Sequence, residues 1–88
     1  MKTEYRQSFL KEILKIKDPK LKNTIAQVIE SVKKAETLAG IPNLKKLRGH
    51  QHFYRIRSGH YRFGISIESQ VVTFVVLAHR KDIYKKFP

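Results

Sequence analysis

The sequence predicts an α+β protein in which an N-terminal helical hairpin packs on a small, mostly antiparallel sheet and a short C-terminal helix follows. Two observations carry this prediction. Apolar residues recur at helical spacing through the first third of the chain, and from Phe53 the spacing changes to the alternation typical of strands. The 88 residues are expected to form a single domain, because a chain of this length buries one core and has no room for a second.

A first helix is predicted from the helical spacing of Phe9, Ile13 and Ile16. Ser8 or Gln7 stands where a cap is expected, and the helix should end near Lys17. The few residues before this helix leave room only for a short strand at the edge of the sheet.

A second helix is predicted to begin at Asp18-Pro19, where Asp18 serves as the N-cap and Pro19 takes the first helical position. Gly40, before Ile41-Pro42, is expected to stop it. The two helices should form a hairpin. One apolar stripe would face the sheet, and it consists of Leu21, Ile25, Val28, Ile29, Val32 and Ala35.

Three strands are predicted after a basic connector that runs from Asn43 to Gln51. The first begins at Phe53, the second covers Tyr61 to Ile67, and the third, Val71 to Ala78, is apolar on both faces, as expected of a covered central strand. Turns are predicted at Ser58-Gly59-His60 and at Glu68-Ser69-Gln70. In the tail, His79 to Phe87, a helix would place Ile83 and Phe87 one turn apart, and Arg80 and Tyr84 likewise.

The composition excludes several classes of protein. With 41% apolar residues the chain is too hydrophobic for intrinsic disorder, and without cysteine it has no disulfides and no thiolate metal site. The first residues lack the apolar stretch of a secretory signal, so we expect a cytoplasmic protein. The longest nearly apolar run, Val71 to Ala78, is far below the roughly 20 residues of a membrane span, which excludes membrane insertion.

The net charge is +12, from nineteen Lys and Arg residues against seven Asp and Glu, and it is unevenly spread. Elsewhere acids are interspersed among lysines, as on solvated helix faces, but the stretch from Thr37 through Ile67 has no carboxylate. Because unneutralised charge repels itself, an anionic partner explains this stretch better than solubility does, and nucleic acid is the leading candidate. Half of the net charge lies there, on Lys45, Lys46, Arg48, Arg55, Arg57 and Arg62.

Strand alternation predicts that three of these arginines share a surface. If Tyr54, Ile56 and the Tyr61 to Ile67 row face the helices, then Arg55, Arg57 and Arg62 face away from them. Planar guanidinium groups suit phosphate oxygens, and Gly64 would leave room for a ligand backbone. The alternative is an ordinary solvated sheet face, although such faces normally carry charges of both signs.

The end of the central strand adds His79 and Arg80, and Tyr84 follows one helical turn later. A histidine, an arginine and a tyrosine close to an arginine cluster are the parts needed to cleave RNA without a metal. One group removes the proton of a ribose 2′-hydroxyl, cations stabilise the charge on phosphorus, and another donor protonates the 5′-oxygen. Structural roles are the alternative, with Tyr84 as an anchor of the tail and His79 as a satisfied histidine.

No cofactor is expected. His50 and His52 have no acid nearby, which argues against a zinc or magnesium site. The chain also has no glycine-rich phosphate loop, no nucleophilic serine or cysteine arrangement and no pair of carboxylates.

Three segments carry a family resemblance. They are Leu47-Arg48-Gly49, the run FYRIRSGHYRF from Phe53 to Phe63, and the run VLAHRKDIY from Val76 to Tyr84. Together with the preceding helical hairpin they resemble the RelE/ParE superfamily of toxins from bacterial type II toxin–antitoxin pairs, over nearly the whole chain. These motifs are shared by the nuclease and non-nuclease branches, and we favour the RelE-like branch.

Resemblance to the RelE branch implies an mRNA interferase that enters the ribosomal A site and cuts the codon presented there. It implies that Arg62 and Arg80 stabilise the transition state and that Tyr84 orients or deprotonates the 2′-hydroxyl. Arg55 and Arg57 would hold phosphates, beside the basic connector residues Lys45, Lys46 and Arg48.

One feature departs from the family. Some of its nucleases carry lysines where this chain has Arg55 and Arg57, and an arginine stays charged and makes a poor base. Proton transfer would then move to His79 or Tyr84, and because histidine titrates nearer neutral pH we predict His79 as the acid or base.

The resemblance also implies a protein partner, an antitoxin whose acidic segment wraps the toxin and masks its basic face. Operator DNA would be bound only through that complex. Two other functions remain open: a ParE-like inhibitor of DNA gyrase, which does not obviously need Arg62, Arg80 and Tyr84 together, and a nonenzymatic nucleic-acid-binding module, for which the charge alone suffices.

Overall fold

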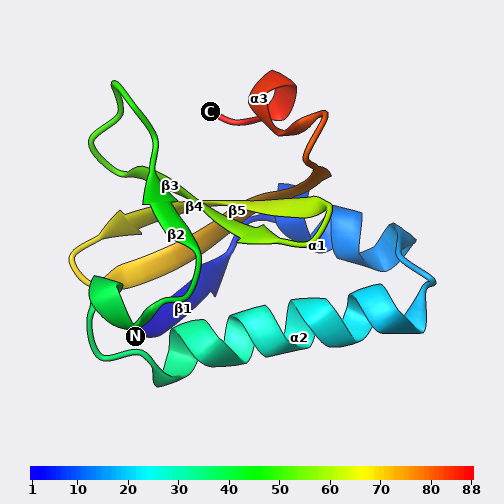
Figure 1. Ribbon diagram of the computed structural model, residues 1–88, viewed down its shortest axis with the longest axis horizontal. Coiled ribbons are helices and arrows are strands. Elements are labelled where there is room, and N and C mark those ends of the chain that lie inside the picture. The colour runs from blue at the N-terminus through cyan, green and yellow to red at the C-terminus, as the bar shows by residue number, and fades with distance from the viewer.

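The computed structural model describes all residues, 1–88, as a five-stranded sheet with helices α1 and α2 on one side and a single helical turn, α3, on the other (Figure 1). The strand order is β1-β5-β4-β3-β2, and only β1 runs parallel to its neighbour, β5. The α+β prediction is therefore confirmed. The elements are β1 (Lys2–Tyr5), α1 (Gln7–Lys15), α2 (Pro19–Lys34), the 3-10 turn η1 (Leu38–Gly40), β2 (Leu44–Lys46), β3 (Phe53–Ser58), β4 (Tyr61–Glu68), β5 (Val71–His79) and α3 (Ile83–Lys86).

Helix α1 begins at Gln7, which is earlier than a cap at Gln7 or Ser8 would allow. Arg6 is the N-cap and makes no side-chain cap, so the prediction of a cap at Ser8 or Gln7 is wrong. Ser8 instead donates its hydroxyl to the carbonyl of Val75, which ties α1 to β5. The helix ends at Lys15, slightly before the predicted Lys17.

Helix α2 begins as predicted, because the Asp18 carboxylate accepts from the Lys20 amide at 3.0 Å and Pro19 opens the helix. The predicted end of the helix, at Gly40, is wrong. The helix stops at Lys34, and Gly40 belongs to the separate turn η1. The α-amino group of Met1 donates to the carbonyls of Val32, Lys33 and Ala35, so these terminal carbonyls are satisfied without a left-handed glycine.

Both edges of the sheet are short strands. The edge strand predicted before the first helix is β1. The opposite edge, β2, was predicted as part of the Asn43 to Gln51 connector. Three residues are too few to display alternation, and pairing with β3 is what makes them a strand.

The main core fills the space between the sheet and the helices α1 and α2. Its aromatic centre is formed by Phe9 of α1 and Phe74 of β5, with ring centroids 5.2 Å apart, and by Phe63 of β4. As predicted, the Tyr61 to Ile67 row and the α2 stripe point into this core. Its 12 buried residues are Phe9, Ile25, Val32, Ala35, Ile41, Ile56, Phe63, Ile65, Ile67, Val72, Phe74 and Leu77.

Strand β5 has a neighbour on each side, and a bulge changes the direction of its side chains. Gly64 is paired with Val76 but Ile65 with Phe74, so Val75 is an extra residue in β5. The bulge lets Phe74 and Leu77 both face the main core.

A second, smaller cluster lies on the opposite face of the sheet. It consists of Leu47, Ala78, Ile83 and Phe87, against which Phe53, Val75 and Val76 pack. This cluster holds α3 above the sheet in Figure 1, on the side away from α2. None of the helices has the length and apolar character needed to cross a lipid bilayer.

Candidate functional site

Three arginines lie on the sheet face that points away from α1 and α2, and we call this surface the arginine face. Arg57 of β3 is paired with Arg62 of β4, and Arg55 is paired with Gly64. Paired residues of antiparallel strands share a face, so the strand alternation predicted from the sequence is the one observed. Lys45 of β2 is paired with Arg55 and extends the same surface to the edge of the sheet.

The Arg62 guanidinium is fixed by its own hairpin. Its Nη1 donates to the carbonyls of Gly59, at 2.9 Å, and Tyr61, at 3.0 Å. Gly59 has a φ of 58°, so the turn that carries this carbonyl needs a left-handed residue. The Nε and Nη2 donors of Arg62 have no protein partner, and they are the pair with which a guanidinium meets a phosphate.

Neighbouring cations act on Arg62. Partial burial, and then the like charges of Arg55, Arg57 and Arg80, lower the pKa of Arg62 below its ordinary value, while the Tyr84 phenolate would act in the opposite direction. Arg62 on β4 is therefore near enough to Arg80, in the turn after β5, and to Tyr84, on α3, for their charges to act on it.

Arg80 and Tyr84 reach this group by different routes. Arg80 lies in the turn before α3, where its amide donates to the His60 carbonyl at 2.7 Å. The prediction that Arg80 and Tyr84 lie one turn apart on the same helix is therefore wrong. Tyr84 lies on α3 between Ile83 and Phe87, which are both buried, and it is 69% exposed itself. Its side chain is available to a ligand.

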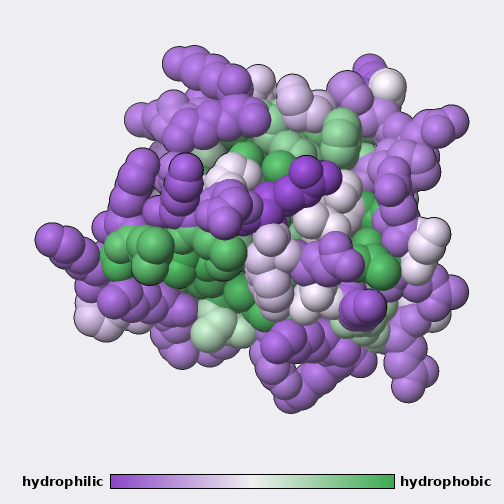
Figure 2. Space-filling view, turned by 180° about the vertical axis from the view of Figure 1, so that it is seen from behind, coloured by the Kyte–Doolittle hydropathy of each residue, from purple (hydrophilic) through white to green (hydrophobic).

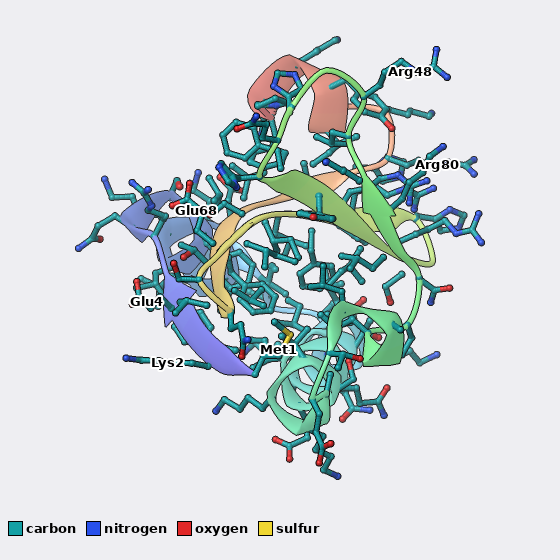
Figure 3. All side chains as sticks on the ribbon, turned by 90° about the vertical axis from the view of Figure 1, so that its left-hand side faces the viewer. Met1, Lys2, Glu4, Arg48, Glu68 and Arg80 are labelled. Carbon is teal, nitrogen blue, oxygen red and sulfur yellow. The ribbon has the colours of Figure 1, made fainter.

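No arginine forms an ion pair. The ion pairs of the chain are Lys15 with Glu12, Lys34 with Glu30, and His52 with Glu68. Figure 3 shows a group of nitrogen-tipped side chains around Arg80, on the side where Arg48 also projects, whereas Glu4 and Glu68 lie on the opposite side with Lys2. The predicted separation of charge is thus a feature of the folded surface.

A groove of about 820 Å³ runs beside the arginine face. Arg55 and Tyr84 form one part of its wall, and β2 with the loop after it forms the other. Sequence reasoning missed Pro88 and Gln51 as lining residues, and no pattern pointed to these two, whereas Gly49 belongs to the Leu47-Arg48-Gly49 motif. The lining residues are Lys45, Lys46, Leu47, Arg48, Gly49, His50, Gln51, Arg55, Tyr84 and Pro88. All three predicted basic connector residues are thus in the groove wall.

His79 does not join the arginine face. It is paired with Tyr61, whose row faces the main core, whereas Arg62 is paired with Ala78 on the other face. The imidazole stacks on His60, with ring centroids 6.0 Å apart, and its Nδ1 accepts from the Lys81 amide. Grouping His79 with the arginines failed because the bulge at Val75 changes which residues of β5 share a face.

The space predicted for a ligand at Gly64 is also taken. A Cβ on Gly64 would lie 2.6 Å from Cγ of Phe87, so the missing side chain accommodates this ring. That expectation is corrected by the second cluster, in which Phe87 is 3% exposed.

Comparison with known proteins identifies the class. No protein-family model matches the chain. It is 34% identical over 89 residues to toxin RelE3 of Methanocaldococcus jannaschii, with the full length of both proteins aligned. It is 29% identical to a chain in the crystal structure of the RelB–RelE antitoxin–toxin complex of Methanococcus jannaschii, with a TM-score of 0.78 and coverage of 97% of this chain and 99% of that one.

A chain of the archaeal RelE–RelB complex of Pyrococcus horikoshii shares the fold, with a TM-score of 0.73 at 16% identity over 93% of this chain and 97% of that one. The fold and its arginine face thus define a small toxin of a toxin–antitoxin system. This chain belongs to the RelE family of such toxins. The family predicted from the sequence motifs is confirmed.

Proposed function

We propose that this toxin is a ribosome-dependent endoribonuclease that cleaves mRNA in the A site by attack of a ribose 2′-hydroxyl, without a metal ion. The observation that carries the proposal is an arginine face without a carboxylate partner, on which Arg57 is paired with Arg62, beside a groove that Arg55 and Tyr84 line together.

The proposed chemical roles are those that the resemblance to the RelE branch implies. The Tyr84 oxygen would orient or deprotonate the 2′-hydroxyl, whose oxygen then attacks phosphorus. Arg62 and Arg80 would stabilise the charge that develops on the phosphoryl oxygens. The bond to the 5′-oxygen breaks, leaving a 2′,3′-cyclic phosphate, and that oxygen takes up a proton. We propose Arg62 or Arg80 as the donor of this proton, and burial and like charges, which lower the pKa of Arg62, favour Arg62.

The mRNA would lie along the groove. Arg55 and Arg57 would hold phosphates on the arginine face, and Lys45, Lys46 and Arg48 would bind the strand from the opposite wall. His79 is left out of this mechanism because its ring lies with Tyr61 and His60.

The experiment is cleavage of mRNA on programmed ribosomes by the purified protein. We expect cuts at the A-site codon with the wild-type protein, and loss of cleavage in the Arg62→Ala/Arg80→Ala variant with folding retained. A folded wild-type protein that leaves mRNA intact but blocks DNA supercoiling by gyrase would establish the alternative function and overturn this one.

We also propose an antitoxin partner that carries an acidic, amphipathic segment. The net charge of +12 and the carboxylate-free arginine face favour such a chain. A second feature is apolar. Leu10, 42% exposed, and Leu14, 83% exposed, lie one turn apart on α1, and Figure 2 shows apolar residues gathered on that side of the molecule. A second copy of this basic chain would be repelled there, whereas an acidic helix would not. Operator DNA would be bound through the antitoxin, and the cytoplasm would be the site of action.

A further inference from the structure

Tyr84 is carried by a helix that is too short to be stable by itself. Tyr84 lies on α3, which is only four residues long, and one helical turn is not stable in water by itself. Its hydrogen bonds are few, with the Phe87 amide donating to the Ile83 carbonyl at 2.8 Å and the Lys85 amide to the Asp82 carbonyl at 3.0 Å. What holds the turn must therefore be packing.

That packing comes from two anchors on either side of Tyr84. Ile83 is 1% exposed and Phe87 is 3% exposed, whereas Tyr84 between them is 69% exposed. Phe87 contacts Phe53 edge to face, with ring centroids 5.1 Å apart. Both anchors belong to the second cluster and neither to the main core, so α3 is attached to the sheet independently of α1 and α2.

Phe87 is seated directly on Gly64 in β4. A Cβ at this position would lie 2.6 Å from Cγ and 2.7 Å from Cδ2 of the ring, and 2.7 Å from Cγ2 of Val76. The backbone of Gly64 is not left-handed, so the glycine is needed for space rather than for conformation. Gly64 is also the partner of Arg55 across the hairpin, which places this contact next to the arginine face.

We propose that Phe87, seated on Gly64, is a positioning residue that holds Tyr84 at the arginine face. Phe87 touches no substrate in this scheme and acts only through the placement of α3. The same cluster contains Leu47, at the base of the loop that bears Arg48. The contact of Phe87 with Gly64, which we call the seat, therefore supports both the Tyr84 wall and the Arg48 wall of the groove. The inference rests on the proposed nuclease function, because Tyr84 must act in cleavage for its position to matter.

The test compares Gly64→Ala with Gly40→Ala. The control is matched, because a Cβ on Gly40 would meet its nearest neighbour at an ordinary 3.5 Å and its φ is also not left-handed. We expect Gly64→Ala to lower the single-turnover rate of A-site cleavage by about 10²-fold, as misplacement of a reacting group by about 1 Å does. Gly40→Ala should stay within about twofold of wild type, well inside the spread of such measurements.

Two further variants separate positioning from general destabilisation. Phe87→Ala removes the anchor without crowding the sheet, and its cleavage rate should fall as far as that of Gly64→Ala. If Gly64→Ala fails to fold, Phe87→Ala still tests the positioning role. Phe87→Leu keeps an apolar anchor and should recover most of the rate. In a Tyr84→Ala background, Gly64→Ala should cause no further loss, since the placement of an absent side chain has no effect.

Amide hydrogen exchange provides a readout that does not depend on RNA. The Phe87 amide should be protected in wild type and in Gly40→Ala, and should exchange freely in Gly64→Ala and Phe87→Ala, while amides of β4 and β5 stay protected in all four. Free exchange of α3 with cleavage unchanged would overturn the positioning role and leave the nuclease function standing. Protection of α3 in Gly64→Ala would overturn the seat itself. A folded wild type that does not cleave would reject the proposed function and with it the catalytic meaning of the seat, while the exchange data would still report whether Gly64 and Phe87 hold α3.

Discussion

Arg57 and Arg62 are direct partners across the β3–β4 hairpin, and neither has a carboxylate within ion-pair distance. Like charges that face each other across strands destabilise a sheet, so this pairing opposes folding. A fold that retains such a pair has a use for the field that the two charges create, which is why the arginine face is the part of the molecule we assign to function.

Removing one charge of this pair should stabilise the protein and weaken its hold on RNA. We expect Arg57→Gln to raise the free energy of unfolding by about 0.5 kcal/mol, which is in the range of cross-strand pair energies, and to reduce the salt dependence of RNA binding. Thermal unfolding and RNA titrations at several salt concentrations measure both effects. Lys22→Gln, on the exposed side of α2, is the matched loss of charge and should leave both nearly unchanged. A destabilised Arg57→Gln protein would contradict this account of the pair.

The Arg62 guanidinium should not be replaceable by another cation. In Arg62→Lys the charge remains but the planar fork is lost, so we expect cleavage to fall by about 10²-fold or more, the range seen for loss of one preorganised donor. RNA affinity should change little. Single-turnover kinetics separate the two quantities, and Arg6→Lys, at the start of α1, is the control that should cleave normally. Equal activity of Arg62→Lys and wild type would show that charge alone is sufficient.

His79 and Tyr84 should behave in opposite ways. His79→Gln should retain cleavage within about threefold, because the ring lies on the other face of the sheet with Tyr61, whereas Tyr84→Phe should lose about 10²-fold, in the range of general acid–base contributions. The same ribosome assay compares the two variants. A large loss in His79→Gln, with an unchanged melting temperature, would restore the role for histidine that the sequence suggested.

A substitution in the turn between β4 and β5 should stabilise the protein without affecting the arginine face or the groove. Ser69 and Gln70 have φ values of 48° and 63°, a left-handed conformation that costs a residue with a side chain about 1 kcal/mol. Gln70→Gly should therefore raise the free energy of unfolding by several tenths of a kcal/mol up to about 1 kcal/mol, equivalent to a few degrees in Tm. Ser66→Gly, within β4, is the control substitution and should destabilise instead. Calorimetry decides between the signs.

The exposed leucines of α1 should matter to the antitoxin and not to cleavage. Each of Leu10→Ser and Leu14→Ser is expected to weaken antitoxin binding by about tenfold, as loss of an apolar interface anchor worth over 1 kcal/mol does, with mRNA cleavage unchanged. Leu38→Ser, an exposed leucine on η1, is the matched control. Isothermal titration with the purified antitoxin measures the affinities, and equal affinities in all variants would show that α1 is not part of the interface.

Much of the fold was predictable because its local signals are strong. Asp18-Pro19 identifies the start of α2 through a cap and a fixed φ, and the alternation through Tyr61 to Ile67 assigns one face of β4 to the core. The end of α2 was not predictable, because the group that satisfies its carbonyls is the α-amino group of Met1, more than thirty residues away. Likewise β2 exists only through its pairing with β3.

The sequence by itself determined the family, the excess of positive charge and the strand alternation that brings Arg55, Arg57 and Arg62 together. These are local or periodic properties, and they are carried by the order of residues alone. Only the tertiary structure decided that His79 turns away from the arginines, that Gly64 holds Phe87 and that Tyr84 lines the groove with Arg55. Each of these depends on the bulge at Val75 or on packing between segments distant in the chain, and no spacing in the sequence encodes the geometry of such contacts.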